Sequence, residues 1–215
     1  MGLFLYDRER SGHCYRIRHL LSILKIQYRK VEIARAGTGR NDAPEDFFRQ
    51  NPRGLVPMLV VDGKAIWEST AILVYIARRY GGEDWLPNDA EGMAEVMKWL
   101  AVAQNEVLYG LALARAHRGN RYPAWRGEAR LIDLQNLGVI ALEAMEHRLK
   151  EANWLALERP TIGDLACFPY VALCPEGGIS LRPFPGVRSW IDRIKDLPGY
   201  IPLPTYNGLG GPIAD

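Results

Sequence analysis

The sequence predicts a two-part protein, with an α/β domain in about the first 80 residues and an all-helical domain after it. In the first part, short apolar or alternating runs typical of strands alternate with runs whose apolar residues recur at helical spacing. Beyond a turn-forming segment at residues 81–89, only helical patterns recur. A chain of 215 residues is long enough for two small domains, here 1–80 and 90–215.

The elements expected in the first domain follow the order β-α-β-α-β-β-α. The periodicity predicts a strand at 2–6, a helix at 15–26, a strand at 27–33 and a short helix at 44–49. A hairpin comes next, because Asp62-Gly63 supplies the positive φ angles of a type I′ turn between apolar flanks. A third helix begins near Ser69, and Glu68 or Ser69 is expected to bond its free N–H groups. This order is that of a thioredoxin-like domain.

The second domain is expected to contain helices only. Two long helices are predicted at 90–118 and 125–153, and a shorter one at 185–195. Between them, Thr161 followed by Asp164 forms a capping box that starts a further apolar helix, so both residues are assigned to folding. The Pro- and Gly-rich tail at 198–215 is expected to lie over a cleft or to stay irregular.

Composition limits the classes of function. Residues 1–80 carry 14 Lys and Arg against 8 Asp and Glu, which suits a small anionic ligand on this half. The basic residues are interspersed with acids and no nucleic-acid motif accompanies them, so no nucleic-acid partner is expected. Three scattered cysteines and four scattered histidines give no metal-site spacing, and no metal is expected. No run approaches the ~20 apolar residues of a membrane span, and no signal peptide is evident, so we expect a cytoplasmic protein.

The stretch from Asn51 to Thr70 carries the strongest functional signal. Pro57 stands at the start of a strand, where a residue without an N–H is tolerated. If the bond before it is cis, the backbone of Val56 turns outward toward a ligand. Val56-Pro57 followed by Trp67-Glu68-Ser69 resembles the glutathione-binding signature of the cytosolic glutathione S-transferases, in their bacterial, serine-type form.

The resemblance implies a set of glutathione contacts. The residue before a cis-proline pairs its backbone with the cysteinyl part of glutathione in this family, which assigns Val56 and Pro57. An acidic residue and a serine at the third helix hold the γ-glutamyl group, which assigns Glu68 and Ser69. A helix N-terminus with free N–H groups is a suitable site for that carboxylate. The alternative is a hairpin and helix of a thioredoxin-like domain that binds no glutathione.

The catalytic donor is expected in the loop that ends Ser11-Gly12-His13-Cys14. A glutathione thiol is mostly protonated at neutral pH, and a hydroxyl at Ser11 can donate to its thiolate. His13 stands where serine-type relatives often have Asn. It can donate a hydrogen bond, or lower the thiol pKa further when protonated, or be an exposed polar residue. Cys14 is expected to face inward, with a redox role as the alternative. Tyr6 lies near the place of the catalytic tyrosine in tyrosine-type transferases, but we expect it to be a packed strand residue.

Three more assignments concern the glycyl end of glutathione, its γ-glutamyl amine and the second substrate. Because Gly54 replaces the side chain that several relatives place at the glycyl end of glutathione, Arg53 is expected to supply the charge there. Glu106 resembles the residue that reaches the γ-glutamyl amine across the dimer interface of related bacterial enzymes. The second substrate is expected against apolar side chains of the helical domain, namely Leu108, Tyr109 and Leu111.

The sequence therefore predicts a glutathione S-transferase that activates the thiol of its co-substrate for attack on a small, apolar electrophile. The family also implies a homodimer. Two alternatives stay open: a glutathione-dependent disulfide reductase on the same scaffold, and a non-catalytic binding or regulatory protein that has kept the fold.

Overall fold

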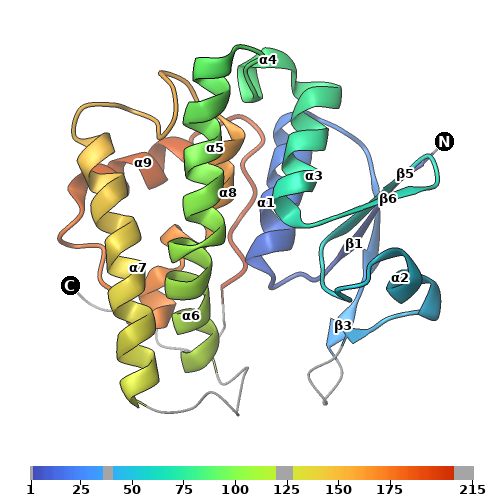
Figure 1. Cartoon of the computed structure of the whole chain (residues 1–215), viewed down its shortest axis with the longest axis horizontal. Helices are drawn as coiled ribbons and strands as arrows, with labels where there is room; N and C mark the ends of the chain where they lie inside the picture. Colours follow the sequence, from blue (N-terminus) through green and yellow to red (C-terminus); the bar gives the residue numbers. More distant parts are fainter. Residues whose placement is uncertain (1, 36–40, 120–127, 206–215) are drawn as a thin grey trace.

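The computed structural model describes residues 2–35, 41–119 and 128–205, and it has the predicted two-part fold (Figure 1). The elements of the thioredoxin-like half are β1 (Leu3–Asp7), α1 (Gly12–Ile23), β2 (Arg29–Glu32), α2 (Glu45–Gln50), β5 (Met58–Val61), β6 (Lys64–Trp67) and α3 (Ser69–Ile76). Two additional short strands that the sequence did not predict, β3 (Ala34–Arg35) and β4 (Asn41–Asp42), pair antiparallel with each other. The fold class predicted from the sequence is confirmed.

The four main strands form one mixed sheet in the order β2-β1-β5-β6. β1 pairs parallel with β2 and antiparallel with β5, and β5 pairs antiparallel with β6. The turn between β5 and β6 has φ of 49° at Asp62 and 79° at Gly63, the two positive angles that a type I′ turn requires. Helices α1 and α3 lie between this sheet and the helical half, and α2 lies on the other side of the sheet (Figure 1).

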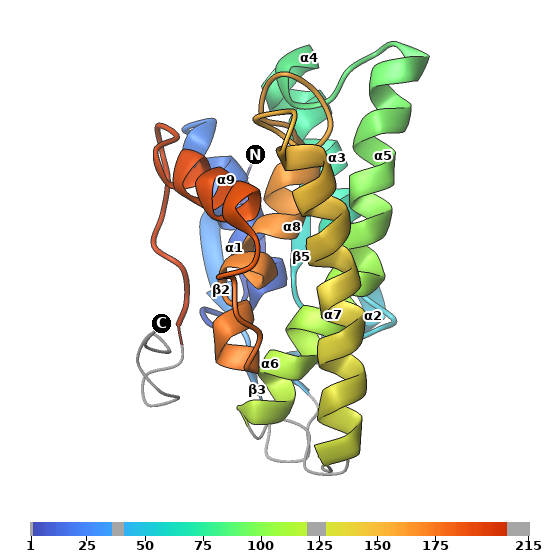
Figure 2. The ribbon, with the colours of Figure 1, turned by 90° about the vertical axis from the view of Figure 1, so that its left-hand side faces the viewer.

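The helical half is an assembly of α5 (Ala90–Gln104), α6 (Leu113–Arg118), α7 (Glu128–Leu149), α8 (Ile162–Ala172) and α9 (Pro185–Lys195), with a 3₁₀ turn η4 (Cys174–Gly177). Two π-helical segments also occur, η1 (Ala77–Gly81) after α3 and η2 (Val107–Ala112) after α5. The short helix α4 (Gly82–Trp85) lies within the segment expected to be a linker. Figures 1 and 2 show α5 and α7 side by side, with α8 behind them toward α1.

Several predicted boundaries were wrong. α1 begins at Gly12 instead of residue 15, because the Ser11 side chain caps its first turn, and it ends at Ile23. The helix expected at 90–118 is divided, since Asn105 adopts φ −105° and ψ −96° and the chain continues as a π-helical segment. Part of the region expected at 125–153 and the tail beyond residue 205 lie outside the described residues.

A close helix contact fixes the divided helix. A Cβ added to Gly110 of η2 would lie only 2.3 Å from the backbone nitrogen of Gly138 in α7. Leu111 next to it is fully buried in the core and packs against the same glycine. Because Gly110 and Leu111 face α7, the neighbouring residues Leu108 and Tyr109 lie on the other side of the segment. There they line the pocket described below.

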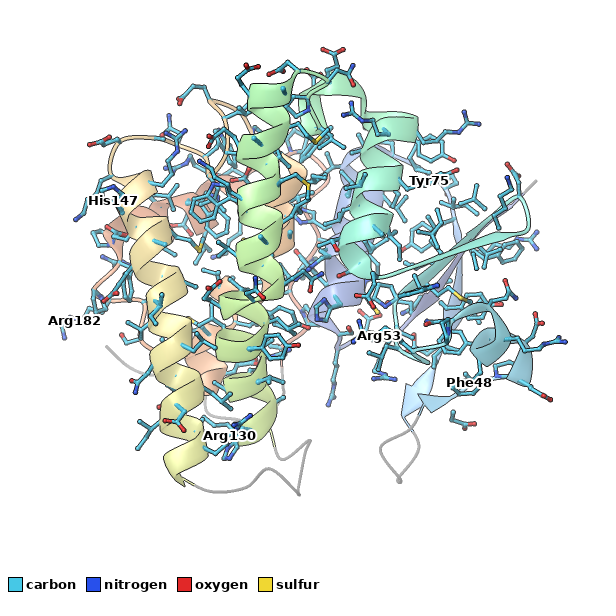
Figure 3. All side chains as sticks on the ribbon, in the orientation of Figure 1. Phe48, Arg53, Tyr75, Arg130, His147 and Arg182 are labelled. Carbon is cyan, nitrogen blue, oxygen red and sulfur yellow. The ribbon has the colours of Figure 1, made fainter. Side chains whose placement is uncertain are left out.

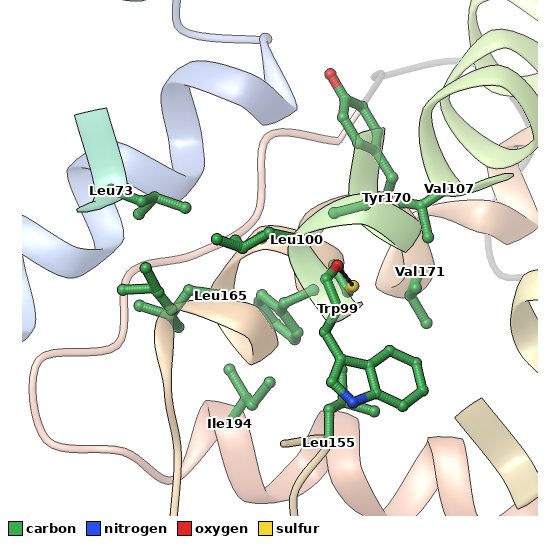
Figure 4. Close-up of a cluster of buried hydrophobic side chains, with 14 of the residues drawn as sticks. Leu73, Trp99, Leu100, Val107, Leu155, Leu165, Tyr170, Val171 and Ile194 are labelled. Atoms are coloured by element: carbon green, nitrogen blue, oxygen red, sulfur yellow. Dashed lines mark hydrogen bonds between the residues drawn. The ribbon is translucent and has the colours of Figure 1, made fainter. Parts of the chain in front are cut away.

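The capping box predicted before α8 is confirmed, and it has a further role. Thr161 Oγ1 accepts from the backbone N–H of Gly163, and Asp164 Oδ2 accepts from the N–H of Thr161 at 2.9 Å. Asp164 Oδ1 also accepts from the indole Nε1 of Trp190 at 2.9 Å. The helix that follows is buried along nearly its whole length, and Figure 4 shows it contributing Leu165 and Val171 to the core.

The described part of the tail, up to residue 205, runs beside α1. The Tyr15 hydroxyl donates to the carbonyl oxygen of Ile201 at 2.6 Å. His19 is completely buried between the rings of Tyr15, Phe168 and Tyr200. Neither ring nitrogen of His19 has a hydrogen-bond partner among the described residues. Burial therefore lowers the pKa of His19 to about 4, and the imidazole is neutral at pH 7.

Among residues 2–35, 41–119 and 128–205, none of the helices combines the length and the apolar character that crossing a membrane requires.

Buried His19 predicts a loss of stability in mild acid. Its pKa is about 4 in the folded chain and about 6.5 in the unfolded chain, so the unfolded chain binds more protons between these values. The contribution of His19 to the free energy of unfolding is complete above pH 6.5 and decreases as the pH falls toward 4. Replacement of His19 by Met should reduce the difference in unfolding free energy between pH 7 and pH 5 by about 2 kcal/mol.

Urea unfolding at the two pH values measures this difference. The matched control is His147→Gln, because His147 is exposed on α7 and labelled at the outer edge of the molecule in Figure 3. Equal acid sensitivity in His19→Met and the unchanged protein would contradict the assignment.

Candidate functional site

One pocket joins the two halves of the molecule. Its volume is about 570 Å³. The thioredoxin-like half lines it with the loop before α1, the segment before β5 and the start of α3, and the helical half lines it with η2, α6 and α8. Figure 3 labels Arg53 at this junction, directly below α3. Seven of the eight residues assigned from the sequence line the pocket: Ser11, His13, Arg53, Val56, Pro57, Glu68 and Ser69.

The segment before β5 presents Val56 to the pocket. The Val56–Pro57 peptide bond is cis, as the sequence analysis expected. The chain before it is held by Asn51, a buried residue whose Nδ2 donates to the Leu55 carbonyl at 2.6 Å. The Oδ1 atom of Asn51 is buried and has no partner among the described residues, and Asn51 lines the same pocket. It is thus an acceptor whose hydrogen-bonding capacity the described residues leave unused.

Ser11 is the N-cap of α1. Its Oγ accepts from the backbone N–H of Cys14 at 3.3 Å, and its side chain is half-buried at the pocket wall. A hydroxyl that accepts through a lone pair keeps its hydrogen for another partner. The Ser11 hydroxyl can therefore cap the helix and donate to an anion in the pocket at the same time.

A buried ion pair fixes the loop that carries Ser11. Asp7, at the end of β1, is completely buried and accepts from Nη1 of Arg18 at 2.7 Å. Arg18 also donates from Nη2 to the carbonyl oxygen of Glu9 at 2.8 Å. Burial acts to lower the pKa of Arg18, but the hydrogen bond to Asp7 and the acidic charges outweigh it and raise that pKa. The guanidinium group thus ties the loop to the end of the sheet.

Ser69 at the start of α3 is the centre of a polar cluster. Its Oγ lies 3.0 Å from Nδ1 of His13 and accepts from Nη1 of Arg16 at 3.3 Å. Since Oγ accepts from Arg16, the Ser69 hydroxyl hydrogen is free to be donated to His13 or to a ligand. The sequence assigned Ser69 to a ligand carboxylate, and its role in the structure is compatible with that assignment.

His13 is neutral at physiological pH. Burial first, and then the charges of Arg16 and Arg53, hold its pKa well below the usual value. The interpretation of His13 as a protonated group that lowers the thiol pKa is therefore wrong. So is the alternative of an exposed residue on the first turn, because the half-buried ring bonds to Ser69 and stacks edge-on against Tyr170. What remains is a neutral donor or acceptor beside the pocket.

Arg16 is a candidate site residue that the sequence did not indicate. It is completely buried, and its Nε and Nη2 atoms have no hydrogen-bond partner among the described residues. Its guanidinium lies 5.8 Å from the ring centre of Tyr170. Burial lowers the pKa of Arg16, but arginine stays protonated in proteins. A positive charge that has no acidic partner among the described residues therefore lies directly behind Ser69, where it favours an anion in the pocket.

Tyr170 is one of the contacts between the two halves at this site. It comes from α8, lines the pocket and lies against the first turn of α1, where a Cβ on Gly12 would be 2.6 Å from its ring. Figure 4 shows Tyr170 at the edge of the buried cluster with its hydroxyl directed away from it. For Arg16 and Tyr170, the only signals in the sequence were the glycine after Ser11 and the arginine within the apolar pattern of the first helix.

Glu68 and Arg53 form an ion pair with each other across the pocket wall. The Glu68 side chain makes no hydrogen bond to the first turn of α3, and its φ is 72°, so the expectation that it caps this helix was wrong. Ser69 does not cap it either, because its hydroxyl is engaged by His13 and Arg16. The pairing puts Arg53 beside the residue assigned to the γ-glutamyl end, and its assignment to the glycyl end stays a prediction.

Glu106 is the assigned residue that does not line the pocket; it is half-buried before η2. Its expected role across a dimer interface stays a prediction. Of the apolar residues assigned to the second substrate, Leu108 and Tyr109 line the pocket, whereas Leu111 is buried in the core. The pocket wall also carries arginines that the sequence analysis did not expect there, namely Arg8, Arg10 and Arg115.

Cys14 and Tyr6 have structural roles. Burial, and secondarily the charge of Asp7, raises the pKa of Cys14 to about 12, so its thiol is not a nucleophile at neutral pH. Tyr6 packs against the ring of Phe47 at 5.5 Å between ring centres, on the α2 side of the sheet. Both observations agree with the inward orientation expected for these side chains.

Three acidic side chains near the loop, Asp7, Glu9 and Glu32, are close enough together to hold a metal ion. All three carboxylates form ion pairs with Lys30, and Asp7 and Glu9 also pair with Arg18. Each of the three carboxylates is therefore already paired with a protein cation.

Comparisons with known proteins give the same family that the sequence resembles. The model of the N-terminal domain of glutathione S-transferases matches residues 1–78, and that of the C-terminal domain matches residues 140–198. Glutathione S-transferase GstB of Escherichia coli is 29% identical over 203 residues, which cover 90% of this chain and 93% of that protein. A maleylacetoacetate isomerase of Rhizobium meliloti is 32% identical over 174 residues, covering 78% of this chain and 79% of that protein.

Solved structures give the same result. A glutathione S-transferase from Xanthobacter autotrophicus superposes with a TM-score of 0.83 and 34% identity, covering 94% of this chain and 96% of that one.

The buried charge of Arg16 predicts that its removal affects the stability of the fold and the affinity for glutathione in opposite directions. A buried cation without an acidic partner lowers the stability of the fold, so Arg16→Met should unfold at the same or a higher temperature. The same change should weaken glutathione binding about tenfold, or ~1.4 kcal/mol, measured by isothermal titration. Arg16→Lys should recover part of the affinity.

Arg79→Met is the matched control, since Arg79 is exposed on η1 and the change removes the same charge. A lower unfolding temperature with unchanged glutathione affinity would mean that Arg16 is a structural residue only.

Proposed function

The chain belongs to the glutathione S-transferase family, and we propose that it transfers glutathione to an electrophilic carbon after stabilising the thiolate. One observation carries the proposal. A single pocket is lined by the Ser11 hydroxyl, the Val56–Pro57 segment and the Glu68-Ser69 pair, which are the three parts that the transferase signature requires. Ser11 comes from a part of the chain distant from the other two, so its position in the same pocket is independent of the signature at 51–70.

Ser11 is the proposed thiolate donor. The thiol of free glutathione has a pKa near ~8.5, so about a few per cent is ionised at neutral pH. A hydrogen bond from the Ser11 hydroxyl favours the ionised form. The α1 N-terminus, where Ser11 already accepts from Cys14, adds the positive end of the helix dipole. The buried charge of Arg16 acts in the same direction.

The tripeptide is proposed to lie between β5 and α3. The backbone of Val56 pairs with its cysteinyl part, Glu68 accepts from the γ-glutamyl ammonium, and Ser69 donates to the γ-glutamyl carboxylate. The position of Arg16 behind Ser69 supports this direction, because a carboxylate there gains from the guanidinium charge. His13, being neutral, serves to orient the Ser69 hydroxyl.

In the proposed reaction, the thiolate sulfur forms a bond to an electrophilic carbon of the second substrate. If that carbon bears a leaving group, the leaving group departs with its bonding electron pair. The thiol proton is lost to solvent before the attack. The chain's own residues bind and orient the tripeptide and hold the negative charge on sulfur. None of them forms a covalent bond to either substrate.

A second candidate function is glutathione-dependent disulfide reduction. It is supported by the similarity to the disulfide-bond oxidoreductase YfcG of Escherichia coli, which is 28% identical over 87% of both chains. With Cys14 buried and protonated, two glutathione molecules must supply both electrons, and no protein disulfide forms.

We also propose that the protein is a cytoplasmic homodimer in which Glu106 reaches the ligand of the partner subunit. The proposal includes two domains joined by a linker at residues 81–89.

Replacement of Ser11 tests the proposal. We expect Ser11→Ala to lower kcat with glutathione and 1-chloro-2,4-dinitrobenzene by about 10- to 100-fold, since a hydrogen bond to a charged group contributes ~1.5–3 kcal/mol. The affinity for glutathione should change little. The pKa of the bound thiol, followed by ultraviolet thiolate absorbance, should rise by about one to two units.

Ser11→Ala also removes the cap of α1, so Ser11→Thr, which keeps hydroxyl and cap, is the matched variant and should retain most activity. The exposed residue Ser189 supplies the distant control, Ser189→Ala. Unchanged turnover in Ser11→Ala would refute the role of Ser11. Absence of glutathione binding in the unaltered protein would favour a non-catalytic binding function, and disulfide reduction without conjugation would favour the second candidate.

A further inference from the structure

The charged residues that line the pocket are strongly unequal in sign. Four arginines take part in the lining, Arg8, Arg10, Arg53 and Arg115, against a single acid, Glu68. Arg53 and Glu68 pair with each other on the side assigned to glutathione. The positive charge that remains belongs to Arg8 and Arg10, in the loop before Ser11, and to Arg115 of the helical half.

Arg115 is mostly engaged by the protein. It is buried on α6, its Nε donates to Glu176 at 2.5 Å and its Nη2 donates to the Pro204 carbonyl at 2.7 Å. The charge available to a ligand is therefore that of the loop between β1 and α1. In this loop Arg8 and Arg10 line the pocket, directly before Ser11.

The acid between these two arginines is turned away from the pocket. Glu9 forms an ion pair with Lys30, and the hydrogen bond from Lys30 is the main cause that lowers the pKa of Glu9. Glu9 is absent from the pocket lining, whereas its two neighbours are present. Arg18 holds the Glu9 carbonyl, and the same contact fixes the loop that carries Ser11. It therefore also fixes Glu9 away from the pocket and its two neighbours toward it.

Arg10 is the arginine best placed to bind a substrate. Its side chain is exposed at the pocket and makes no hydrogen bond or ion pair to any residue within 2–35, 41–119 and 128–205. Arg8 differs, because its Nε donates to the Ile33 carbonyl at 3.2 Å. Arg10 directly precedes the proposed thiolate donor, so a group bound by it lies close to the sulfur.

The wall contributed by the helical half is apolar. Leu108, Tyr109 and Leu113 present carbon surface to the same pocket. A ligand that satisfies both sides must have an apolar body and an anionic group. A guanidinium presents paired donors in a planar fork, which matches a carboxylate.

Electrostatics supports this combination. Glutathione with its thiol ionised carries a net negative charge, and it would repel an anionic second substrate. Positive charge in the loop beside Ser11 offsets that repulsion and raises the local concentration of anions. A neutral electrophile gains nothing from these arginines.

We propose that the second substrate is an electrophile with an apolar body and a carboxylate group, and that Arg10 binds the carboxylate. This inference rests on the proposed transferase function and replaces the expectation of an apolar electrophile. Arg8 supplies additional positive charge, and Leu108 and Leu113 contact the body of the substrate.

Two aryl chlorides of opposite character test the proposal. One is 1-chloro-2,4-dinitrobenzene, which is neutral, and the other is 4-chloro-3,5-dinitrobenzoate, which carries a carboxylate. In each, the thiolate forms a carbon–sulfur bond and chloride leaves with the bonding pair. The quantity measured is the ratio of kcat/KM for the carboxylate to kcat/KM for the neutral compound, at saturating glutathione. We expect Arg10→Gln to lower this ratio about tenfold, and Arg10→Lys to lower it less.

Arg182→Gln is the matched control, because Arg182 is exposed on the opposite edge of the molecule and the change removes the same charge (Figure 3). It should leave the ratio unchanged. The effect of Arg10→Gln should decrease with added salt. An unchanged ratio in Arg10→Gln, or a higher KM for glutathione without a change in the ratio, would overturn the proposal.

A binding measurement separates this inference from the proposed function. If the unaltered protein conjugates neither compound, the proposed transferase function fails. The affinities of the two glutathione conjugates, determined by titration, then decide the inference. Tighter binding of the carboxylate-bearing conjugate, lost in Arg10→Gln, would support it, and equal affinities would overturn it.

Discussion

The ion pair between Asp7 and Arg18 is the contact on which the site depends. Asp7 ends the first strand and Arg18 lies in the first helix, so the pair ties the sheet to the helix across the loop that carries Ser11. Removal of one partner of a buried ion pair costs roughly 3–5 kcal/mol because the other charge is left unpaired. Here it would also release the carbonyl of Glu9 and with it the orientation of the loop. Stability and the geometry of the site thus depend on one contact.

The first helix contains two buried arginines with opposite functions. Arg18 is satisfied by a carboxylate and two carbonyl groups, and it fixes the loop. Arg16 is two residues earlier, which turns it about 200° around the helix toward α3 and α8, and it has a serine as its only hydrogen-bond partner among the described residues. An unmatched buried charge lowers stability, and such features are expected where a protein binds an opposite charge.

Much of the fold could be predicted because its signals are local. Asp62-Gly63 set the hairpin, Thr161 and Asp164 set the start of α8, and the signature around Val56 and Ser69 marked one wall of the pocket. The rest depended on contacts between distant residues. The neutral state of His13 follows from Arg16 and burial, and the division of the long helix follows from the contact of Gly110 with α7. No local pattern contains that information.

The pocket itself is a product of both halves, and this explains why its second ligand was harder to predict than its first. The glutathione side is built from one hairpin and one helix start, which are neighbours in the sequence. The other side combines the loop before Ser11 with η2, whose position depends on Gly110 and Gly138. Because Asp7, Arg18 and Lys30 hold this loop from outside the pocket, Arg10 contributes charge at the pocket while other residues fix the loop. A change at Arg10 can therefore alter the preferred charge of the electrophile while the glutathione side keeps its geometry.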